Sequence, residues 1–424
     1  MNYFFQSIKG MHDYLPEQTI LWNKIEDIFK KILHNYGYCE IKLPILEKTI
    51  LFKASIGEMT DIIGKEMYSF HDKNNLSITL RPEATTSCVR SIIQNKLIYH
   101  KKQKLWYYGP MFRYERPQKG RYRQFYQFGL ETFGFFELDI EFELIILVNK
   151  FWKALGISRF LTLEINSIGL LSERNAYQME LRNFLKTYES YLDNICIRQL
   201  NKNPLRILDS KNKNIQKILL KAPNLIDFVN TKSRLRFEKL CNLLSNFNIP
   251  YTINYKLIRG LDYYNDTVFE WKTNYIGSQN AICAGGRYDT LVKRLLGPDT
   301  PAAGLAIGMD RLILLIQSLN LFSQKNIETD IHIFFSNKSI KNRAIFLSEE
   351  IRNEFPKLKI LLEFQSKKIN TIFKNIKKYF TKIILFIQSE NIIYLYDVIC
   401  KKNQIINSNN INIMIKNIFN FYTK

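Results

Sequence analysis

The stretch that most constrains the fold runs from Gly109 to Glu131, with the sequence GPMFRYERPQKGRYRQFYQFGLE. Two alternating segments flank RPQKG, which is turn-prone and too polar to be buried, so the stretch predicts two strands joined by a basic loop. Because side chains alternate across a strand, we expect Tyr126, Phe128 and Leu130 to face the core.

The opposite face of the second strand predicts a binding site. It combines an aromatic ring, an amide, a gap without a side chain and a carboxylate, from Phe125, Gln127, Gly129 and Glu131. One small polar ligand could reach all of these groups.

The incoming strand and the loop predict a phosphate site. Arg113 and Glu115 share a face of the strand, and the loop adds Arg116, Lys119, Arg121 and Arg123. Guanidinium groups suit phosphate, since the planar fork donates two parallel hydrogen bonds and does not lose its proton. A solvated basic hairpin tip is the alternative, and the ordered Gln and Glu on the face below the loop weigh against it.

The segment FRYERPQKGRYRQF resembles motif 2 of class II aminoacyl-tRNA synthetases, and RPQKGRYRQF specifically resembles the histidyl-tRNA synthetase family. The resemblance implies an α+β fold with an antiparallel-sheet catalytic core, a helical insertion and a C-terminal α/β anticodon-binding domain. It implies these divisions: residues 1–169, core with motifs 1 and 2; 170–250, insertion; 251–325, second part of the core; 326–424, anticodon-binding domain.

Bulk properties agree with a nucleic-acid partner. The 424 residues allow about two or three domains, and the net charge of +22 favours polyanions. Lysine is heavily used throughout the chain, so the clustered arginines are the better signal. The six cysteines are scattered, which supports neither a zinc site nor disulfides. With no signal-peptide core and no membrane-spanning run, we predict a cytoplasmic protein with no membrane partner.

The N-terminal part predicts a loop, KGMHDYLPEQ, and an amphipathic helix that carries Trp22, Ile25, Ile28, Phe29 and Ile32. A strand-like run then extends into Pro44, which favours a sheet edge or a bulge. This region resembles class II motif 1, whose helix and strand, with Pro44, form the homodimer interface. An ordinary edge strand is the alternative.

Residues 77–90, SITLRPEATTSCVR, predict a strand that ends at Pro82 and a helix capped near Thr85 or Thr86. The resemblance implies that Glu83 and Thr85 bind the amino group of the substrate amino acid. The family usually has Gly at the position of Ala84. A solvated carboxylate that caps a helix is the alternative.

Residues 170–250 are helical in pattern and resemble by position the insertion of bacterial histidyl enzymes, which contacts the tRNA acceptor arm. A purely structural insertion is equally open. The segments LIRGLDYYNDTVFEW and AICAGGRYD, residues 257–271 and 281–289, resemble the two signatures peculiar to histidyl-tRNA synthetases and close relatives. GLAIGMDRLILL resembles motif 3, with Asp310 where most class II enzymes have Glu.

The C-terminal residues predict a small parallel α/β domain. DIHIFF, KILLEFQ and KIILFIQ are typical of strands, with helices expected at residues 339–354 and 367–380. The unit resembles the anticodon-binding domain of the family, although Gln365, Ser366, Lys367 and Lys368 replace the glycine-rich turn after the second strand.

The resemblance implies that histidine and ATP form histidyl-adenylate and that the histidyl group then moves to histidine tRNA. Because the substrate carboxylate is ionised at neutral pH, the first step needs alignment and charge stabilisation rather than a base. Arg113 and Arg259 are the implied catalytic residues on the α-phosphate, and magnesium accompanies ATP. The implied ATP-binding residues are Arg113, Glu115, Arg121, Phe125 and Arg311.

The neutral imidazole ring has one donor and one acceptor nitrogen. Glu131 could accept from the first and Tyr264 donate to the second. The implied histidine-binding residues are Glu83, Thr85, Gln127, Glu131, Tyr263 and Tyr264. Arg116, Gln118 and Lys119 are candidates for contact with the tRNA acceptor stem, and no protein metal site is expected.

The alternative function is a catalytically inactive, synthetase-like regulatory subunit of ATP phosphoribosyltransferase. Such relatives typically lose the arginine of RGLDYY, the motif 2 arginine and often the C-terminal domain. The chain has Arg259, Arg113 and a C-terminal unit. These features favour the synthetase.

Overall fold

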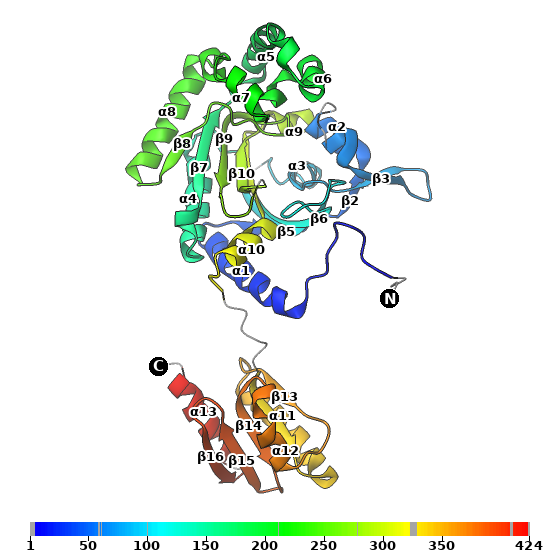
Figure 1. Ribbon diagram of the computed structural model, residues 1–424, viewed down its shortest axis with the longest axis vertical. Helices are drawn as coiled ribbons and strands as arrows, with labels where there is room; N and C mark the ends of the chain where they lie inside the picture. Colours follow the sequence, from blue (N-terminus) through cyan, green and yellow to red (C-terminus); the bar gives the residue numbers. More distant parts are fainter. Residues whose placement is uncertain are drawn as a thin grey trace. The chain divides into compact units, whose positions relative to one another are not determined.

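The computed structural model describes residues 5–57, 60, 62–99, 101–210, 212–277, 279–322, 329–407 and 410–422. The chain divides into two compact units, Met1–Phe322 and Ser323–Lys424 (Figure 1). The boundary predicted between residues 325 and 326 lies outside the described residues.

The first unit is built on a large sheet that has eight strands within the described part of the chain. The outermost pairs, β1 with β5 and β7 with β8, are parallel, and the other neighbours are antiparallel. This confirms the predicted antiparallel core. From edge to edge the strands are β1 (Cys39–Glu40), β5 (Gln103–Phe112), β6 (Gln124–Phe133), β11 (Ala302–Gly308), β10 (Ala281–Arg287), β9 (Asn265–Lys272), β7 (Thr162–Ser167) and β8 (Tyr251–Ile253).

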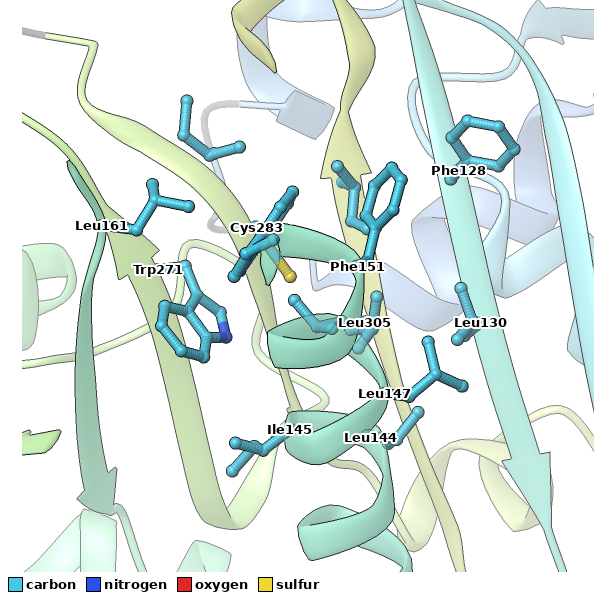
Figure 2. Close-up of a cluster of buried hydrophobic side chains, with 14 of the residues drawn as sticks. Phe128, Leu130, Leu144, Ile145, Leu147, Phe151, Leu161, Trp271, Cys283 and Leu305 are labelled. Carbon is cyan, nitrogen blue, oxygen red and sulfur yellow. The ribbon is translucent and has the colours of Figure 1, made fainter. Parts of the chain in front are cut away.

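The predicted hairpin is β5 and β6, in which Tyr107 pairs with Gly129 and Trp106 with Leu130. Phe128 and Leu130 of β6 are fully buried, as their alternation predicts. They pack into a core with Phe151 of the helix that crosses this face of the sheet (Figure 2). Each such side chain contributes about 1.5–3 kcal/mol when fully buried.

Four helices cover this face and contribute to its core: α1 (Pro16–Asn35), α4 (Asp139–Ala154), α8 (Thr231–Asn246) and α10 (Met309–Ser318). The other face carries the second core, with α3 (Thr85–Gln94), α9 (Thr290–Arg294) and part of the insertion. A smaller sheet of β2 (Leu46–Lys48), β4 (Ser77–Leu80) and β3 (Tyr68–His71), together with α2 (Thr49–Ile56), precedes α3 in the chain.

Helices fill the chain between β7 and β8. They are α5 (Leu171–Lys186), α6 (Asn194–Lys202), α7 (Lys213–Leu219) and α8. Tyr177 and Leu181 of α5 are buried in the second core, whereas Phe237 and Leu240 of α8 belong to the first. The insertion therefore packs against both faces of the sheet.

The second unit is a mixed sheet, which corrects the prediction of a parallel one. The pairs of β12 with β13 and with β14 are parallel, but β15 and β16 continue as antiparallel strands. The expected helix at 367–380 is only α12, followed by a turn of 3-10 helix at Ile376–Lys378. The bounds are β12 (Thr329–Phe335), α11 (Lys341–Glu354), β13 (Ile360–Leu362), α12 (Ile369–Lys374), β14 (Thr381–Ile387), β15 (Ile392–Asp397), β16 (Lys402–Asn407) and α13 (Ile411–Tyr422).

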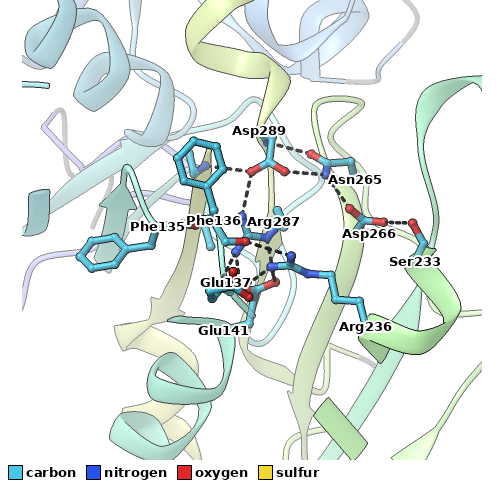
Figure 3. Close-up of polar contacts among 12 residues, drawn as sticks. Phe135, Phe136, Glu137, Glu141, Ser233, Arg236, Asn265, Asp266, Arg287 and Asp289 are labelled. Atoms are coloured by element: carbon cyan, nitrogen blue, oxygen red, sulfur yellow. Dashed lines mark hydrogen bonds and ion pairs between the residues drawn. The ribbon is translucent and has the colours of Figure 1, made fainter. Parts of the chain in front are cut away.

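A buried charged cluster joins strand β10, helix α4 and helix α8 of the insertion (Figure 3). Arg287 at the end of β10 is 1% exposed, and its Nε and Nη2 lie 2.8 and 2.5 Å from the two carboxylate oxygens of Glu141 on α4. Its other N–H groups donate to the carbonyl oxygens of Phe135 and Glu137 and to Asp289. Arg236 of α8 donates to the same Glu141 over 3.2 Å. The signature arginine is thus a structural residue of the core.

We expect Arg287→Met to lower the free energy of unfolding by about 3–5 kcal/mol, because it leaves the Glu141 charge buried and poorly paired. The matched variant Arg236→Met removes a partner that is 22% exposed and should have a smaller effect. Urea unfolding of the full chain, followed by circular dichroism, measures both. Equal losses in the two variants would contradict the assignment.

Candidate active site

A pocket opens on the second-core side of the sheet and holds about 980 Å³ of space, including the part open to solvent. The junction of β4 and α3, the β5–β6 hairpin and strands β9, β10 and β11 build its walls, with the start of α10. The predicted residues that line it are Glu83, Thr85, Arg113, Glu115, Arg121, Phe125, Gln127, Arg259, Tyr263, Tyr264 and Arg311.

Four arginines line the pocket: Arg113, Arg121, Arg259 and Arg311. Burial lowers the pKa of Arg113, and the charge of Arg259 lowers it further. Burial, followed by the charge of Arg113, lowers the pKa of Arg311 to about 10. These guanidinium groups are therefore close enough to repel one another, and an anionic ligand would relieve that repulsion.

Backbone carbonyl groups fix two of these arginines. Arg113 donates from Nε to the carbonyl oxygen of Pro82 over 2.8 Å, and its guanidinium lies 5.2 Å from the ring centre of Phe125. Arg311 donates from Nε to Gly120 over 2.8 Å and from Nη1 to Ala281 over 2.9 Å. Since carbonyl oxygens carry no net charge, these bonds orient the cations without neutralising them.

The loop arginine Arg121 is paired with carboxylates. Its Nε donates to Glu115, and its Nη2 lies 3.4 Å from Glu66. Its side chain is 36% exposed, so it lies at the mouth of the pocket rather than in its floor. Glu115 is the less exposed partner, at 9%.

The acceptor-stem candidates Arg116, Gln118 and Lys119 are exposed at the tip of the hairpin and do not line the pocket. The tip is closed by a pair of backbone hydrogen bonds between Gln118 and Arg121, of 3.1 and 2.9 Å. Pro44 is also exposed, on the segment between β1 and β2.

Glu83 lies at the strand-to-helix junction and is 4% exposed. Its carboxylate accepts from the backbone N–H of Thr86 over 3.1 Å. The residue before the helix is Ala84, and Thr85 is the first helical residue, so Glu83 supplies the cap that the sequence assigned to Thr85 or Thr86. Burial raises the pKa of Glu83, and these bonds oppose the shift.

Glu131 lies beneath the pocket rather than in its lining, and it is 1% exposed. One carboxylate oxygen accepts from Thr85 Oγ1 over 2.7 Å and from the hydroxyl of Tyr107 over 2.9 Å. The other accepts from the hydroxyl of Tyr288. Burial raises the pKa of Glu131 to about 8, and bonds from these hydroxyls oppose the rise. Tyr264, in contrast, lines the pocket directly.

The family model described as Histidyl-tRNA synthetase matches residues 10–312, which is more than half of the chain. The chain belongs to the histidyl-tRNA synthetase family. It is 55% identical over 375 residues to the histidine--tRNA ligase of Buchnera aphidicola subsp. Schizaphis graminum, covering 88% of each chain. It is 52% identical over 402 residues to that of Buchnera aphidicola subsp. Baizongia pistaciae, covering 94% of this chain and 95% of the relative.

Solved structures agree with membership of the histidyl-tRNA synthetase family. The apo S. aureus histidyl-tRNA synthetase matches with a TM-score of 0.80 at 29% identity, over 97% of this chain and 100% of that chain. An ATP phosphoribosyltransferase regulatory subunit/histidyl-tRNA synthetase from Bacillus halodurans C matches with a TM-score of 0.64 at 22% identity, over 92% of this chain and 100% of that chain. This second match shows a shared fold alone. The α+β class II fold is confirmed.

Sequence reasoning missed several residues that line this family member's pocket, among them Tyr107, Tyr122 and Glu270. The register of the hairpin could have revealed Tyr107, because it pairs with Gly129. A β-carbon at Gly129 would overlap the ring of Tyr107, so the expected gap in the site is filled by this ring. Glu270 lies on β9, far along the chain from the β5–β6 hairpin. The residues around Glu270 do not indicate that β9 lies at the same pocket as the hairpin.

The pKa of Glu131 gives a test of its position. A carboxyl group whose pKa is raised from 4.5 to about 8 stabilises the fold below pH 4.5, and this contribution is lost as the pH rises to about 8. We expect the unfolding free energy of the wild type to fall between pH 6 and pH 8, relative to Glu131→Gln, by at most about 1.4 kcal/mol per pH unit. Urea titrations across this range measure the difference. Parallel pH profiles of the two proteins would place Glu131 in water.

Proposed function

We propose that the chain joins L-histidine to histidine tRNA in two steps, through histidyl-adenylate made from histidine and ATP. The observation that supports this most is a single pocket whose lining includes Arg113 and Arg259 together with Glu83 and Tyr264. Relatives that are 50–55% identical over most of the chain are histidine--tRNA ligases.

In the first step a carboxylate oxygen of histidine attacks the α-phosphorus of ATP, and the bond to the bridging oxygen breaks to release pyrophosphate. Negative charge builds on the phosphoryl oxygens, and fixed cations stabilise it. Arg113 and Arg259 are the groups suited to this role, because their bonds to the protein hold them in place before ATP arrives. In the second step a hydroxyl of the terminal adenosine attacks the carbonyl carbon, and AMP leaves.

Phe125 and Arg311 are proposed to enclose the adenine ring, as stacking on an aromatic ring and a guanidinium would favour. Arg121 at the mouth would contact the outer phosphates. Magnesium would arrive with ATP, and Glu115 beside Arg121 offers an oxygen ligand of the type that this ion prefers. When bound there, magnesium would neutralise charge on the outer phosphates.

Histidine is proposed to bind at the other part of the pocket. Glu83 with Thr85 would hold its ammonium group, and Gln127 and Tyr263 would complete the contacts to its main chain. Tyr264 would donate to one ring nitrogen. The second ring nitrogen would reach Glu131 beside Tyr107, which lines the pocket and already bonds to that carboxylate. Such bonds can reject isosteres by about four to five orders of magnitude.

Partners beyond the small substrates are also proposals. The exposed Arg116, Gln118 and Lys119 suit a phosphate backbone, and the C-terminal unit would read the anticodon. A homodimer would form around Pro44, where the exposed side chains include Ile45, Leu46 and Ile50. Reduced cysteines, none in a disulfide, support the cytoplasm as the compartment. Among the described residues, no helix is long and apolar enough to cross a membrane.

The regulatory-subunit alternative has less support. A regulatory role needs no cation on the α-phosphate, yet Arg113 and Arg259 both line the pocket. The C-terminal unit is also present, with its own core of Ile331, Ile333 and Leu385.

The deciding experiment is ATP–pyrophosphate exchange with each of the twenty amino acids. We expect exchange with histidine alone, and at least about 10²-fold slower exchange in Arg259→Ala, which removes a transition-state donor. Arg159→Ala is the matched control, because Arg159 is exposed and outside the pocket. Exchange with another amino acid, or none at all, would refute the proposed function.

The exposed loop generates a second expectation. Removing both charges with Arg116→Gln and Lys119→Gln should raise the KM for tRNA about tenfold, since two exposed ion pairs of about 0.2–1 kcal/mol each can together supply the ~1.4 kcal/mol of a tenfold change. Adenylate formation should stay within about twofold, and the salt dependence of the tRNA KM should flatten. Lys73→Gln, at another exposed turn, is the control. Equal losses in exchange and in aminoacylation would rule out this contact.

A further inference from the structure

Glu270 on β9 is a carboxylate where a phosphate site would not be expected to have one. It lines the pocket and is 9% exposed. An unpaired carboxylate there would repel ATP. Its oxygens are instead shared by two cations, with Arg259 Nη1 at 3.0 Å and Lys272 Nζ at 3.1 Å. The Glu270 carboxylate is therefore paired on both of its oxygens.

The bond to Glu270 engages only one end of the Arg259 guanidinium. Nη1 is the atom that is used, and Nε is buried without a hydrogen-bond partner in the part of the chain that the structure describes. A buried donor without a partner is costly and is rarely retained without a reason. Nε and Nη2 form the edge of the guanidinium that donates two parallel bonds to paired oxygens of a phosphate.

Arg259, Glu270 and Lys272 form a row of charged side chains that continues to Glu164, which does not line the pocket. Lys272 Nζ also lies 2.8 Å from Glu164 on β7, and Asn254 donates to the same Glu164 oxygen over 2.7 Å. Lys272 thus holds Glu270 from the side opposite Arg259. Because the rigid strands β7 and β9 carry these groups, the Glu270 carboxylate has a fixed place at the pocket wall.

We propose that Glu270 is the positioning residue for Arg259, holding Nη1 so that the rest of the guanidinium is directed toward the α-phosphate. This inference rests on the proposed function. Glu270 itself would not touch substrate. The carboxylate fixes the direction of the cation, and Lys272 shares the Glu270 charge, so that Arg259 is not its sole partner.

Burial acts against a charged Arg259 and lowers its pKa, but the neighbouring Glu270 carboxylate and the hydroxyl of Tyr264 outweigh this, so the net shift is upward. Arg259 therefore stays a full cation in the closed pocket. An ordinary structural salt bridge would have the same net effect, so the experiment has to separate orientation from stability.

The test is a double-mutant cycle in histidine-dependent ATP–pyrophosphate exchange. Glu270→Gln keeps the shape and removes the charge, and we expect kcat to fall about 10- to 100-fold, as misplacement of a catalytic group commonly causes. The Kd for histidine, measured by calorimetry on the same protein, should stay within about twofold. In the Arg259→Ala background, Glu270→Gln should cause no further loss, because its effect passes through Arg259.

Two further variants complete the test. Glu164→Gln changes the outer end of the charged row, does not contact Arg259 and should exchange within about twofold of the wild type. Glu270→Asp is tested in the same double-mutant cycle. Any decrease in kcat that it causes in the wild-type background should be absent in the Arg259→Ala background. Losses that multiply in the double variants, or an equal loss in Glu164→Gln, would overturn the inference.

The failures of the two proposals differ. Wild-type exchange in Arg259→Ala would refute the role of Arg259 under the proposed function. A strong loss in Arg259→Ala together with normal exchange in Glu270→Gln would refute this inference alone.

Discussion

The site depends on keeping guanidinium groups together in one partly buried pocket although they repel one another. Arg113 and Arg311 are held by carbonyl oxygens, which orient a cation and leave its charge intact. Arg259 is held by Glu270, whose charge is in turn matched by Lys272. The carbonyl bonds leave the charges of Arg113 and Arg311 intact, and the sharing of Glu270 with Lys272 leaves Arg259 without a carboxylate of its own. The strands and the helix junction must be rigid to maintain these positions, which explains why a large sheet with a core on each face carries this pocket.

Two acidic side chains at the pocket, Glu83 in its lining and Glu131 beneath it, are held by neutral groups. Glu83 accepts from a backbone N–H, and Glu131 accepts from hydroxyl groups of Thr85, Tyr107 and Tyr288. A carboxyl group satisfied by neutral donors remains available to a positively polarised ligand group. Glu115 and Glu270 differ, because each of them pairs with an arginine of the same lining.

The sequence predicted those residues of the site whose placement follows from the alternation of side chains along a strand. The alternation of β6 placed Phe128 and Leu130 in the core, and Gln127 in the lining. It also put Glu131 on the pocket side, but could not show that hydroxyls from three other elements cover it. Tyr107 and Glu270 depend on strand register and on the return of a distant strand, which no local period reveals. In the second unit, the hairpin of β15 and β16 was missed because β15 (IIYLYD) is a mostly apolar run and β16 (KNQIIN) is mostly polar, so neither gives a clear alternating signal.

Asp310 stands where most class II enzymes have Glu, and its contacts explain how the shorter side chain fits. Its carboxylate accepts from the backbone N–H of Tyr126 over 2.7 Å and from the hydroxyl of Tyr14. The first bond ties α10 to β6, and the second ties it to the segment before α1. The same segment accepts a backbone bond from Arg123 at Gly10, over 2.7 Å. Asp310 thus links these segments through one backbone N–H and one tyrosine hydroxyl. An aspartate is long enough for this role because the Tyr14 hydroxyl reaches it. Arg311, the residue proposed to contact the nucleotide, bonds to the loop at Gly120 independently of Asp310.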